Sequence, residues 1–122
     1  MTIIEAINKI DTLKPNTYTQ SEKVKWLSAL DSLIYKEIIS THEGDTTFTG
    51  YTDETPIDTT LLAEEPYDEM YIHWLESKID YYNAEYARYN NSVTAFDEIY
   101  NNYSKHYNRT HKPKTTKLRY FR

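Results

Sequence analysis

The middle of the chain carries acidic and histidine side chains whose spacing is that of a metal site. Glu69, His73 and Glu76 recur at steps of four and three residues, and Asp80 follows one turn later. In a helix this spacing places them on one face, as in carboxylate-bridged metal bundles, which also need matching carboxylates on a partner helix. The other long helical segment has its acidic residues at a different spacing: Glu22, Asp31 and Glu37. The pattern therefore favours solvated charges and a surface or interface histidine over a metal centre.

The remaining histidines and the composition give little support to other enzyme chemistry. His42, His106 and His111 stand apart in the sequence, without a recognisable serine partner for nucleophilic catalysis. The chain has no cysteine, which excludes disulfides, cysteine-ligated metal and a cysteine nucleophile. Its 2 glycines are too few for a dinucleotide-binding turn or a phosphate-binding loop. We therefore expect a non-enzymatic protein that needs no cofactor.

The length and the charge distribution predict one domain with a tail of opposite charge. A chain of 122 residues is short for two domains. All 19 acidic residues lie at or before Glu98, whereas 7 of the 14 basic residues lie from Lys105 onward. The formal net charge of −5 therefore separates into −12 for the body and +7 for the last 18 residues. Such a separation indicates that body and tail contact different surfaces, or contact each other between subunits.

Hydropathy predicts neither a membrane span nor a secretion signal. No apolar run approaches the roughly 20 residues that a membrane helix needs. The N-terminus also lacks a basic region followed by an apolar core. We expect a protein that is not secreted and does not interact with membranes.

Two capping boxes predict where the first pair of helices begins. Thr2 with Glu5, and Thr19 with Glu22, have the spacing at which two residues cap each other's backbone amides. The first helix ends before Pro15, because proline disfavours the helical conformation at the preceding residue. The second extends for about 20 residues. Apolar residues follow both starts at helical intervals: Ile3, Ile7 and Ile10, then Leu27, Leu30, Ile34 and Ile38.

A second pair of helices is predicted in the C-terminal half. The third begins at Pro66 and carries an apolar seam at steps of three and four residues up to Tyr89. Asn90–Ser92 then interrupts the pattern, with a continuous or kinked helix as the alternative, and a fourth helical segment follows over 93–107. The short connection makes these two helices antiparallel neighbours. The sequence thus predicts an all-α fold, a small antiparallel bundle of about four helices within a domain of residues 1–107.

Residues 44–60 break the helical pattern. They hold both glycines, 7 threonines, 4 acidic residues and Pro56. The alternation of threonine and phenylalanine at 47–49 suits a short hairpin or an extended arm. A structureless loop of this length is unusual in so small a domain. We therefore expect either a projecting functional arm or a poorly ordered segment.

Tyrosine is the most over-represented residue, with 13 copies concentrated between Tyr67 and Tyr107. Stacking on the bases of single-stranded nucleic acid is one use of such rings, but it needs a positive groove and this region is acidic. Tyrosine also suits a core and a subunit interface, because its ring can be buried while its hydroxyl reaches water. We favour the interface. The predicted oligomer interface comprises Tyr71, Trp74, Tyr81, Tyr82, Tyr86, Tyr89, Tyr100 and Tyr103.

The basic tail, residues 108–122, is predicted to be extended and to contact a partner. Pro113 and the absence of acidic residues argue against a continued helix. The tail could bind a phosphate backbone, contact an acidic protein surface, or lack a partner. Apolar residues among its charges favour docking on protein. The predicted docking residues are Arg109, Lys112, Lys114, Lys117, Arg119, Tyr120, Phe121 and Arg122.

The stretch Leu61–Lys114 also resembles a known protein family. The matching elements are Leu61–Leu62 before Pro66–Glu69, Ile79–Asn83 with Glu85, Tyr89–Ser92, and Tyr107–His111. They are similar to the head-tail connector, or head-completion, proteins of long-tailed phages and prophages of Gram-positive bacteria. The resemblance covers a little under half of the chain, contains no catalytic signature and does not extend to residues before Leu61.

This resemblance implies a virion structural protein at the head-tail junction, assembled in the host bacterial cytoplasm. Connectors form a ring of about 12 subunits below the portal protein. The ring extends the channel through which DNA passes without sequence specificity, and it carries the next connector or the tail-completion protein. In this setting the basic tail would contact the portal or a neighbouring subunit, and the arm would face the channel or the adjoining ring. The alternative is a nucleic-acid-binding accessory protein that uses its basic tail.

Overall fold

The first two helices begin at the reciprocal caps that the sequence predicts. In the computed structural model, which describes residues 1–44 and 46–114, α1 spans Ile3–Leu13 and α2 spans Gln20–Glu37. The Glu5 amide donates to Thr2 Oγ1 at 3.2 Å, and the Thr2 amide donates to Glu5 Oε1 at 2.8 Å. Thr19 and Glu22 form the same pair of bonds, each at 3.1 Å. Both predicted helix starts are confirmed, and a short 3-10 turn, η1 (Ile39–Thr41), follows α2.

The second pair of helices forms an antiparallel hairpin whose turn differs from the predicted one. Helix α3 spans Glu69–Tyr82, and α4 spans Tyr86–Thr110. Between them Ala84 takes a left-handed conformation with φ of 60°, which ends α3. The favoured break at Asn90–Ser92 is therefore wrong, and the alternative of a helix that continues through these residues is confirmed, because they lie inside α4. Ser92 instead turns its hydroxyl toward α3, so the polar run serves a contact between helices.

The start of α3 and the end of α4 also differ from the predicted positions. Residues 65–68 form turns around a cis Glu65–Pro66 bond, so α3 begins after Pro66 and not at it. Helix α4 continues through Thr110, beyond the predicted end at residue 107. Asn108 and Arg109 are therefore helical and do not belong to an extended tail.

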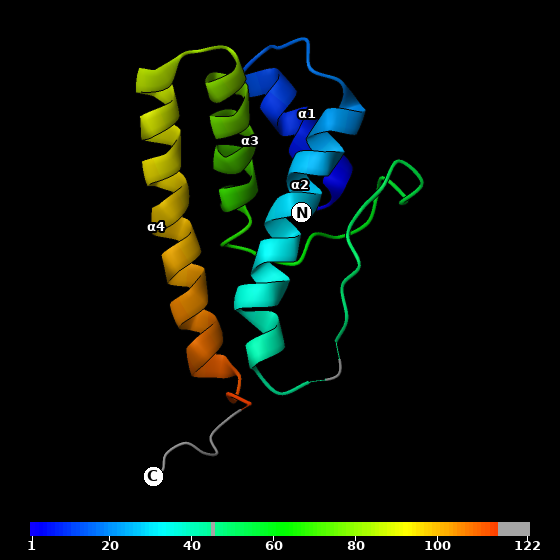
Figure 1. The fold of residues 1–122 in the computed structure, drawn as a ribbon, viewed down its shortest axis with the longest axis vertical. Helices are drawn as coiled ribbons and strands as arrows, with labels where there is room; N and C mark the ends of the chain where they lie inside the picture. The colour runs from blue at the N-terminus through cyan, green and yellow to red at the C-terminus, as the bar shows by residue number, and fades with distance from the viewer. Residues whose placement is uncertain (45, 115–122) are drawn as a thin grey trace.

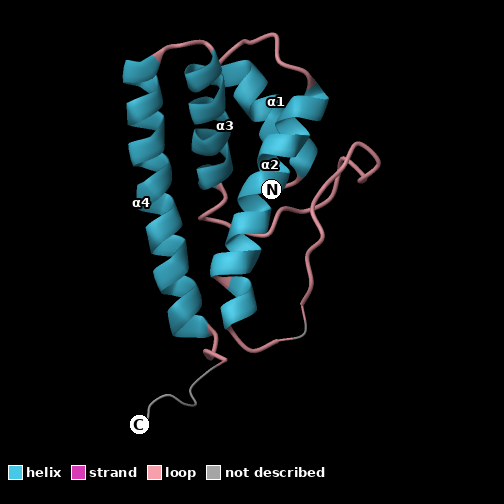
Figure 2. Ribbon diagram, in the orientation of Figure 1, coloured by secondary structure: helices cyan, strands magenta, loops and turns pink. Residues whose placement is uncertain are grey.

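The four helices make an all-α bundle with α3 in contact with each of the others (Figures 1 and 2). Figure 1 shows α4 running antiparallel to α3 on one side, and α1 and α2 on the other. The α1–α2 loop and the α3–α4 turn lie at one end of the molecule. The C-terminal ends of α2 and α4 lie at the opposite end. Within the described part of the chain, no helix is both long and apolar enough to span a membrane.

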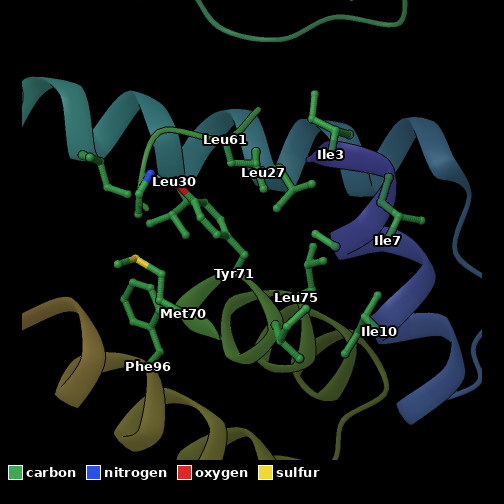
Figure 3. Close-up of a cluster of buried hydrophobic side chains, with 14 of the residues drawn as sticks. Ile3, Ile7, Ile10, Leu27, Leu30, Leu61, Met70, Tyr71, Leu75 and Phe96 are labelled. Carbon is green, nitrogen blue, oxygen red and sulfur yellow. Dashed lines mark hydrogen bonds between the residues drawn. The ribbon is translucent and has the colours of Figure 1, made fainter. Parts of the chain in front are cut away.

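The core forms where the apolar stripes of the helices meet (Figure 3). The predicted stripes of α1 and α2 are buried, because each faces α3 across the bundle. Full burial of each aliphatic side chain contributes about 1.5–3 kcal/mol to folding. The α3 residues at the centre of the core are Met70, Tyr71, Ile72, Leu75 and Ile79.

The arm is irregular and is attached to α2 along part of its length. No strand occurs in its described residues, so it is not a hairpin. Tyr51 is 8% exposed, and its amide donates to Ser28 Oγ of α2 at 2.9 Å. Tyr35 of α2 donates its hydroxyl to the Thr46 carbonyl at 2.9 Å. Residues 52–54 are exposed, so the arm is not buried along its whole length.

Candidate interaction surface

Aromatic rings from three helices form a connected surface, which we call the aromatic face. Near the α3–α4 turn, Trp26 of α2 stacks on Tyr82 of α3 with centroids 5.8 Å apart and planes 10° from parallel. The Tyr81 ring lies 5.4 Å from both Tyr82 and Tyr89 and 6.1 Å from Tyr86. These contacts join α2, α3 and the first turns of α4 into one patch.

The aromatic face continues from Trp26 of α2 onto Trp74 of α3 and then onto α4. Trp74 of α3 donates its indole N–H to the Trp26 carbonyl at 2.7 Å. The Trp74 ring lies 5.2 Å from Phe96, which in turn lies 5.5 Å from Tyr100 of α4. The Lys78 ammonium lies 4.5 Å from the centroid of the Trp74 ring, a cation–π contact. Burial against this surface lowers the pKa of Lys78.

Hydrogen bonds at the edges hold several of these rings in place. Tyr18, from the α1–α2 loop, packs edge-on against Trp26 and donates its hydroxyl to Asn83 Oδ1 at 2.7 Å. Tyr100 donates its hydroxyl to Glu37 Oε1 at 2.7 Å. Burial, and then this bond to Glu37, raise the pKa of Tyr100. Side chains that are fixed before binding lose little conformational entropy when a partner covers them.

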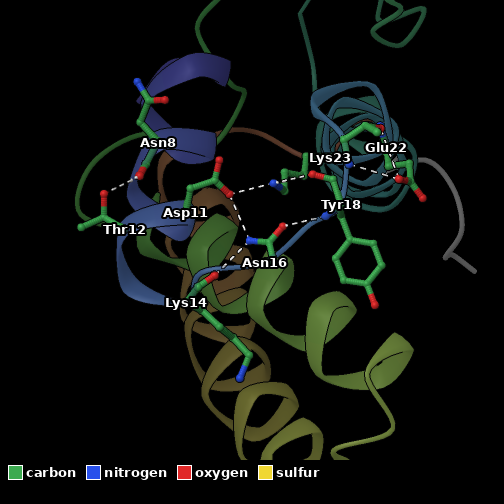
Figure 4. Close-up of polar contacts among 9 residues, drawn as sticks. Asn8, Asp11, Thr12, Lys14, Asn16, Tyr18, Glu22 and Lys23 are labelled. Carbon is green, nitrogen blue, oxygen red and sulfur yellow. Dashed lines mark hydrogen bonds and ion pairs between the residues drawn. The ribbon is translucent and has the colours of Figure 1, made fainter.

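A polar network in the α1–α2 loop positions Tyr18 (Figure 4). The buried Lys23 ammonium lies 2.7 Å from Asp11 Oδ1 and donates to the Tyr18 carbonyl at 2.9 Å. Asn16 donates to Asp11 at 3.1 Å and accepts from the Tyr18 amide at 3.1 Å. The loop after Pro15 is therefore fixed, and it brings Tyr18 beside Trp26.

The part of the aromatic face near the α3–α4 turn is the most accessible, whereas Phe96 is 7% exposed. Tyr81 is 50% exposed, and Tyr82 and Tyr86 are each 58% exposed. Contiguous exposed aromatic groups are uncommon on monomeric proteins and mark interaction sites. Tyrosine and tryptophan are also the residues enriched at protein interfaces.

The structure brings six of the predicted interface residues together on this face: Trp74, Tyr81, Tyr82, Tyr86, Tyr89 and Tyr100. Tyr71 and Tyr103 do not belong to it, because they are 0% and 1% exposed inside the core. The prediction for these two is corrected accordingly. Sequence reasoning left out Tyr18, Trp26 and Phe96, since only the fold brings the loop and α2 beside the α3–α4 hairpin.

Tyr71 instead belongs to a buried network around Asp31 of α2. The Asp31 carboxylate is 0% exposed and accepts hydrogen bonds from Tyr51 at 2.5 Å, Tyr71 at 2.6 Å and the Leu62 amide at 3.0 Å. Burial raises the pKa of Asp31, and the three hydrogen bonds oppose that shift. The Ala63 amide donates to the Tyr71 hydroxyl at 2.7 Å. This network fastens the arm and the segment before α3 to α2.

The residues with metal-site spacing do not converge. Glu69 pairs with Lys9 of α1 at 2.8 Å, away from His73. His73 Nδ1 lies 3.4 Å from Glu76 Oε1, and Asp80 is buried beside Lys14. Among residues 1–44 and 46–114, no group of three or more candidate ligands is arranged to hold a metal ion.

The beginning of the predicted docking tail is fastened to the end of α2. The Glu43 amide donates to the Lys112 carbonyl at 2.8 Å, and the Lys114 amide donates to the Thr41 carbonyl at 2.9 Å. The buried His42 lies between these segments, with Nε2 2.9 Å from Asn108 Oδ1. Arg109 is on the surface of α4. The other predicted docking residues lie outside the described part of the chain: Lys117, Arg119, Tyr120, Phe121 and Arg122.

No protein-family model matches the chain, and no curated protein or solved structure matches it. The structure itself shows which surfaces the protein presents. Their arrangement combines a small helical bundle, a pre-ordered aromatic face and a basic C-terminal segment at the opposite end.

Proposed function

We propose that this protein is a structural assembly subunit, a head-tail connector of a long-tailed phage or prophage. The resemblance of residues 61–114 supports the connector assignment. The aromatic face supports assembly, and it is the single structural observation on which the proposal depends. In this proposal the protein forms a ring below a portal protein, extends the DNA channel and carries the next connector or tail-completion protein.

The chemistry of the aromatic face suits contact with another protein chain. Tyrosine rings bury a large area with few rotatable bonds, and their hydroxyls remain satisfied at a wet rim. A ring requires each subunit to present two different surfaces to its neighbours. The aromatic face would supply one of them.

The C-terminal segment is proposed to contact the portal or a neighbouring subunit. Its exposed basic residues include Lys105, Arg109, Lys112 and Lys114. A test of this role should cut the chain after Thr110, because α4 continues to that residue. Cutting after Tyr107 would also remove Asn108, the hydrogen-bond partner of His42.

Electron microscopy of the full chain mixed with the portal protein of the same phage or prophage tests the proposed function. The expected result is ring-shaped density on one face of the portal. A portal that stays bare at saturating protein concentration would contradict the proposal. A chain truncated after Thr110 should still fold. It should fail to bind the portal if the C-terminal segment is the docking element.

A second candidate is a nucleic-acid-binding accessory protein that uses its basic C-terminal tail, favoured by the exposed Lys112 and Lys114 after α4. Phosphate contacts make binding steeply salt-dependent. Fluorescence anisotropy with duplex and single-stranded DNA at two salt concentrations tests this function. Salt-dependent binding that disappears when residues 111–122 are removed would support it, and binding that survives the removal would count against a role of the tail.

A further inference from the structure

A polar cleft of about 710 Å³ lies between the end of α1 and the facing sides of α3 and α4. Its carboxylates come from Glu76, Asp80 and Glu85, and its cations from Lys14 and Arg88. It is separate from the aromatic face, whose residues do not line it. The proposed assembly role does not use it.

Two observations show that the carboxylates of this cleft share few hydrogen-bond donors among the described residues. Ser92 Oγ lies 3.1 Å from Glu76 Oε1 and 2.9 Å from Asp80 Oδ2. A serine hydroxyl has one proton, and ionised carboxylates only accept, so Ser92 can serve one of the two at a time. Asp80 is 1% exposed, and its Oδ1 receives no hydrogen bond from the described residues.

Lys14 neutralises the negative charge of the cleft carboxylates only in part. Lys14 Nζ lies 2.6 Å from Asp80 Oδ1 and 3.3 Å from Glu85 Oε1. The contact between Lys14 and Asp80 is a close ion pair, and it is the largest cause of the raised pKa of Lys14. Lys14 is thus shared by two carboxylates. The half-exposed Glu76 has only His73, at 3.4 Å, as a basic neighbour within ion-pair distance in the described chain.

We propose that this cleft binds a guanidinium group with Glu76 as its principal carboxylate, because Glu85 already has Lys14 and Arg88 as cationic neighbours at 3.3 and 3.6 Å. A planar guanidinium carries five N–H donors and pairs with a carboxylate through two parallel hydrogen bonds. A bound guanidinium would donate hydrogen bonds to Glu76. The Ser92 hydroxyl would then donate to Asp80 alone. The apolar side chains of Leu13, Pro15 and Ala95 give the cleft walls on which an aliphatic stem can lie.

A guanidinium group can come from two sources: a free small molecule, or an arginine side chain of a protein segment. Agmatine, which has a guanidinium and no carboxylate, represents the free cation. A synthetic peptide of residues 108–122, which contains Arg109, Arg119 and Arg122, represents a protein segment. Binding of agmatine alone would identify the small-molecule source. Peptide binding that is much tighter than agmatine binding, and is lost when its arginines are replaced by glutamine, would identify the segment.

The test is a titration of the full chain, followed by amide chemical shifts at low salt, with agmatine and with the peptide. We expect saturable shifts around Glu76, Asp80 and Ser92. Glu76→Gln should weaken binding by about tenfold, as the loss of a charge-assisted pair implies. Glu69→Gln is the matched control, since it makes the same change on the same helix outside the cleft.

Thermal unfolding of each variant checks that the fold is kept, and Glu85→Gln serves as a second cleft variant. Absence of saturable shifts with both probes would overturn the proposal. Equal weakening by Glu76→Gln and Glu69→Gln would do so as well, because binding would then reflect the acidic surface in general. Neither outcome bears on assembly with a portal, so the two proposals fail separately.

Discussion

The indole ring of Trp26 stacks on the phenol ring of Tyr82, with centroids 5.8 Å apart and planes 10° from parallel. Tyr82 is nevertheless 58% exposed, so the stack orders an aromatic side chain at the surface and does not bury it. Such a pair contributes about 0.5–1.5 kcal/mol beyond its buried area. The aromatic face is therefore ordered before any partner arrives.

Exposed and buried tyrosines should differ strongly in their effect on stability. Tyr82→Ala should lower the free energy of unfolding by about 1 kcal/mol, because it removes ring contacts at an exposed site and opens no cavity. Tyr71→Ala should lower it by at least about 3 kcal/mol, since it opens a cavity and leaves Asp31 short of a donor. Urea unfolding followed by circular dichroism measures both. Similar losses for the two variants would contradict the assignment of Tyr82 to the surface.

The buried Asp31 should make stability depend on pH. Burial raises its pKa in the folded protein above the unfolded value, so folding favours the protonated form. Its contribution is fully present below the unfolded pKa and is lost as the pH rises through the folded pKa. The wild type should therefore gain stability relative to Asp31→Asn as the pH falls from neutrality. Urea unfolding of both proteins across that range checks this, and a constant difference would refute it.

The hydroxyl of Tyr51 should control the attachment of the arm. Tyr51→Phe keeps the ring but removes a donor from the buried Asp31, which should cost about 1–3 kcal/mol. The Tyr51 backbone amide, bonded to Ser28, should also exchange faster with solvent. Tyr35→Phe removes an exposed hydroxyl bond from the same arm and should have a much smaller effect. Hydrogen exchange measured by NMR distinguishes them, and equal effects would argue against an anchoring role of Asp31.

Asn108 should hold the start of the C-terminal segment against α2. Asn108→Ala removes the partner of His42 Nε2, so the Lys114 amide, bonded to Thr41, should lose protection. Asn102→Ala changes an exposed residue of the same helix and should leave that amide protected. Amide exchange rates of the two variants provide the comparison. Unchanged protection in Asn108→Ala would show that the backbone pairing alone holds the segment.

Local signals predicted the helix starts, because each capping box closes within a few residues. The stripe of Ile3, Ile7 and Ile10 likewise identified a buried face from spacing alone. The turn between α3 and α4 was misplaced because Asn90–Ser92 is a stronger breaker by composition than Asn83–Glu85. Tertiary contacts decided the outcome, since the Ser92 hydroxyl meets Asp80 of α3.

The spatial relationships between segments distant in the sequence could not be predicted in this way. Tyr71 and Tyr81 lie in similar local patterns of polar and apolar residues. Tyr71 is nevertheless hydrogen-bonded to Asp31 in the core, whereas Tyr81 is half exposed. Their difference depends on which side of α3 is covered by α2. The role of Asp31 was missed for the same reason, because its partners come from the arm, from Leu62 and from α3.

Electron microscopy of portal complexes, comparing aromatic-face variants, tests most directly the claim that this face drives assembly. The double variant Tyr81→Ser and Tyr86→Ser removes two exposed rings, and Leu33→Ser, at a side chain 36% exposed outside both the aromatic face and the cleft, is the control. We predict closed rings on the portal with wild type and Leu33→Ser, and no rings with the double variant. Complete rings formed by a folded double variant would contradict the account.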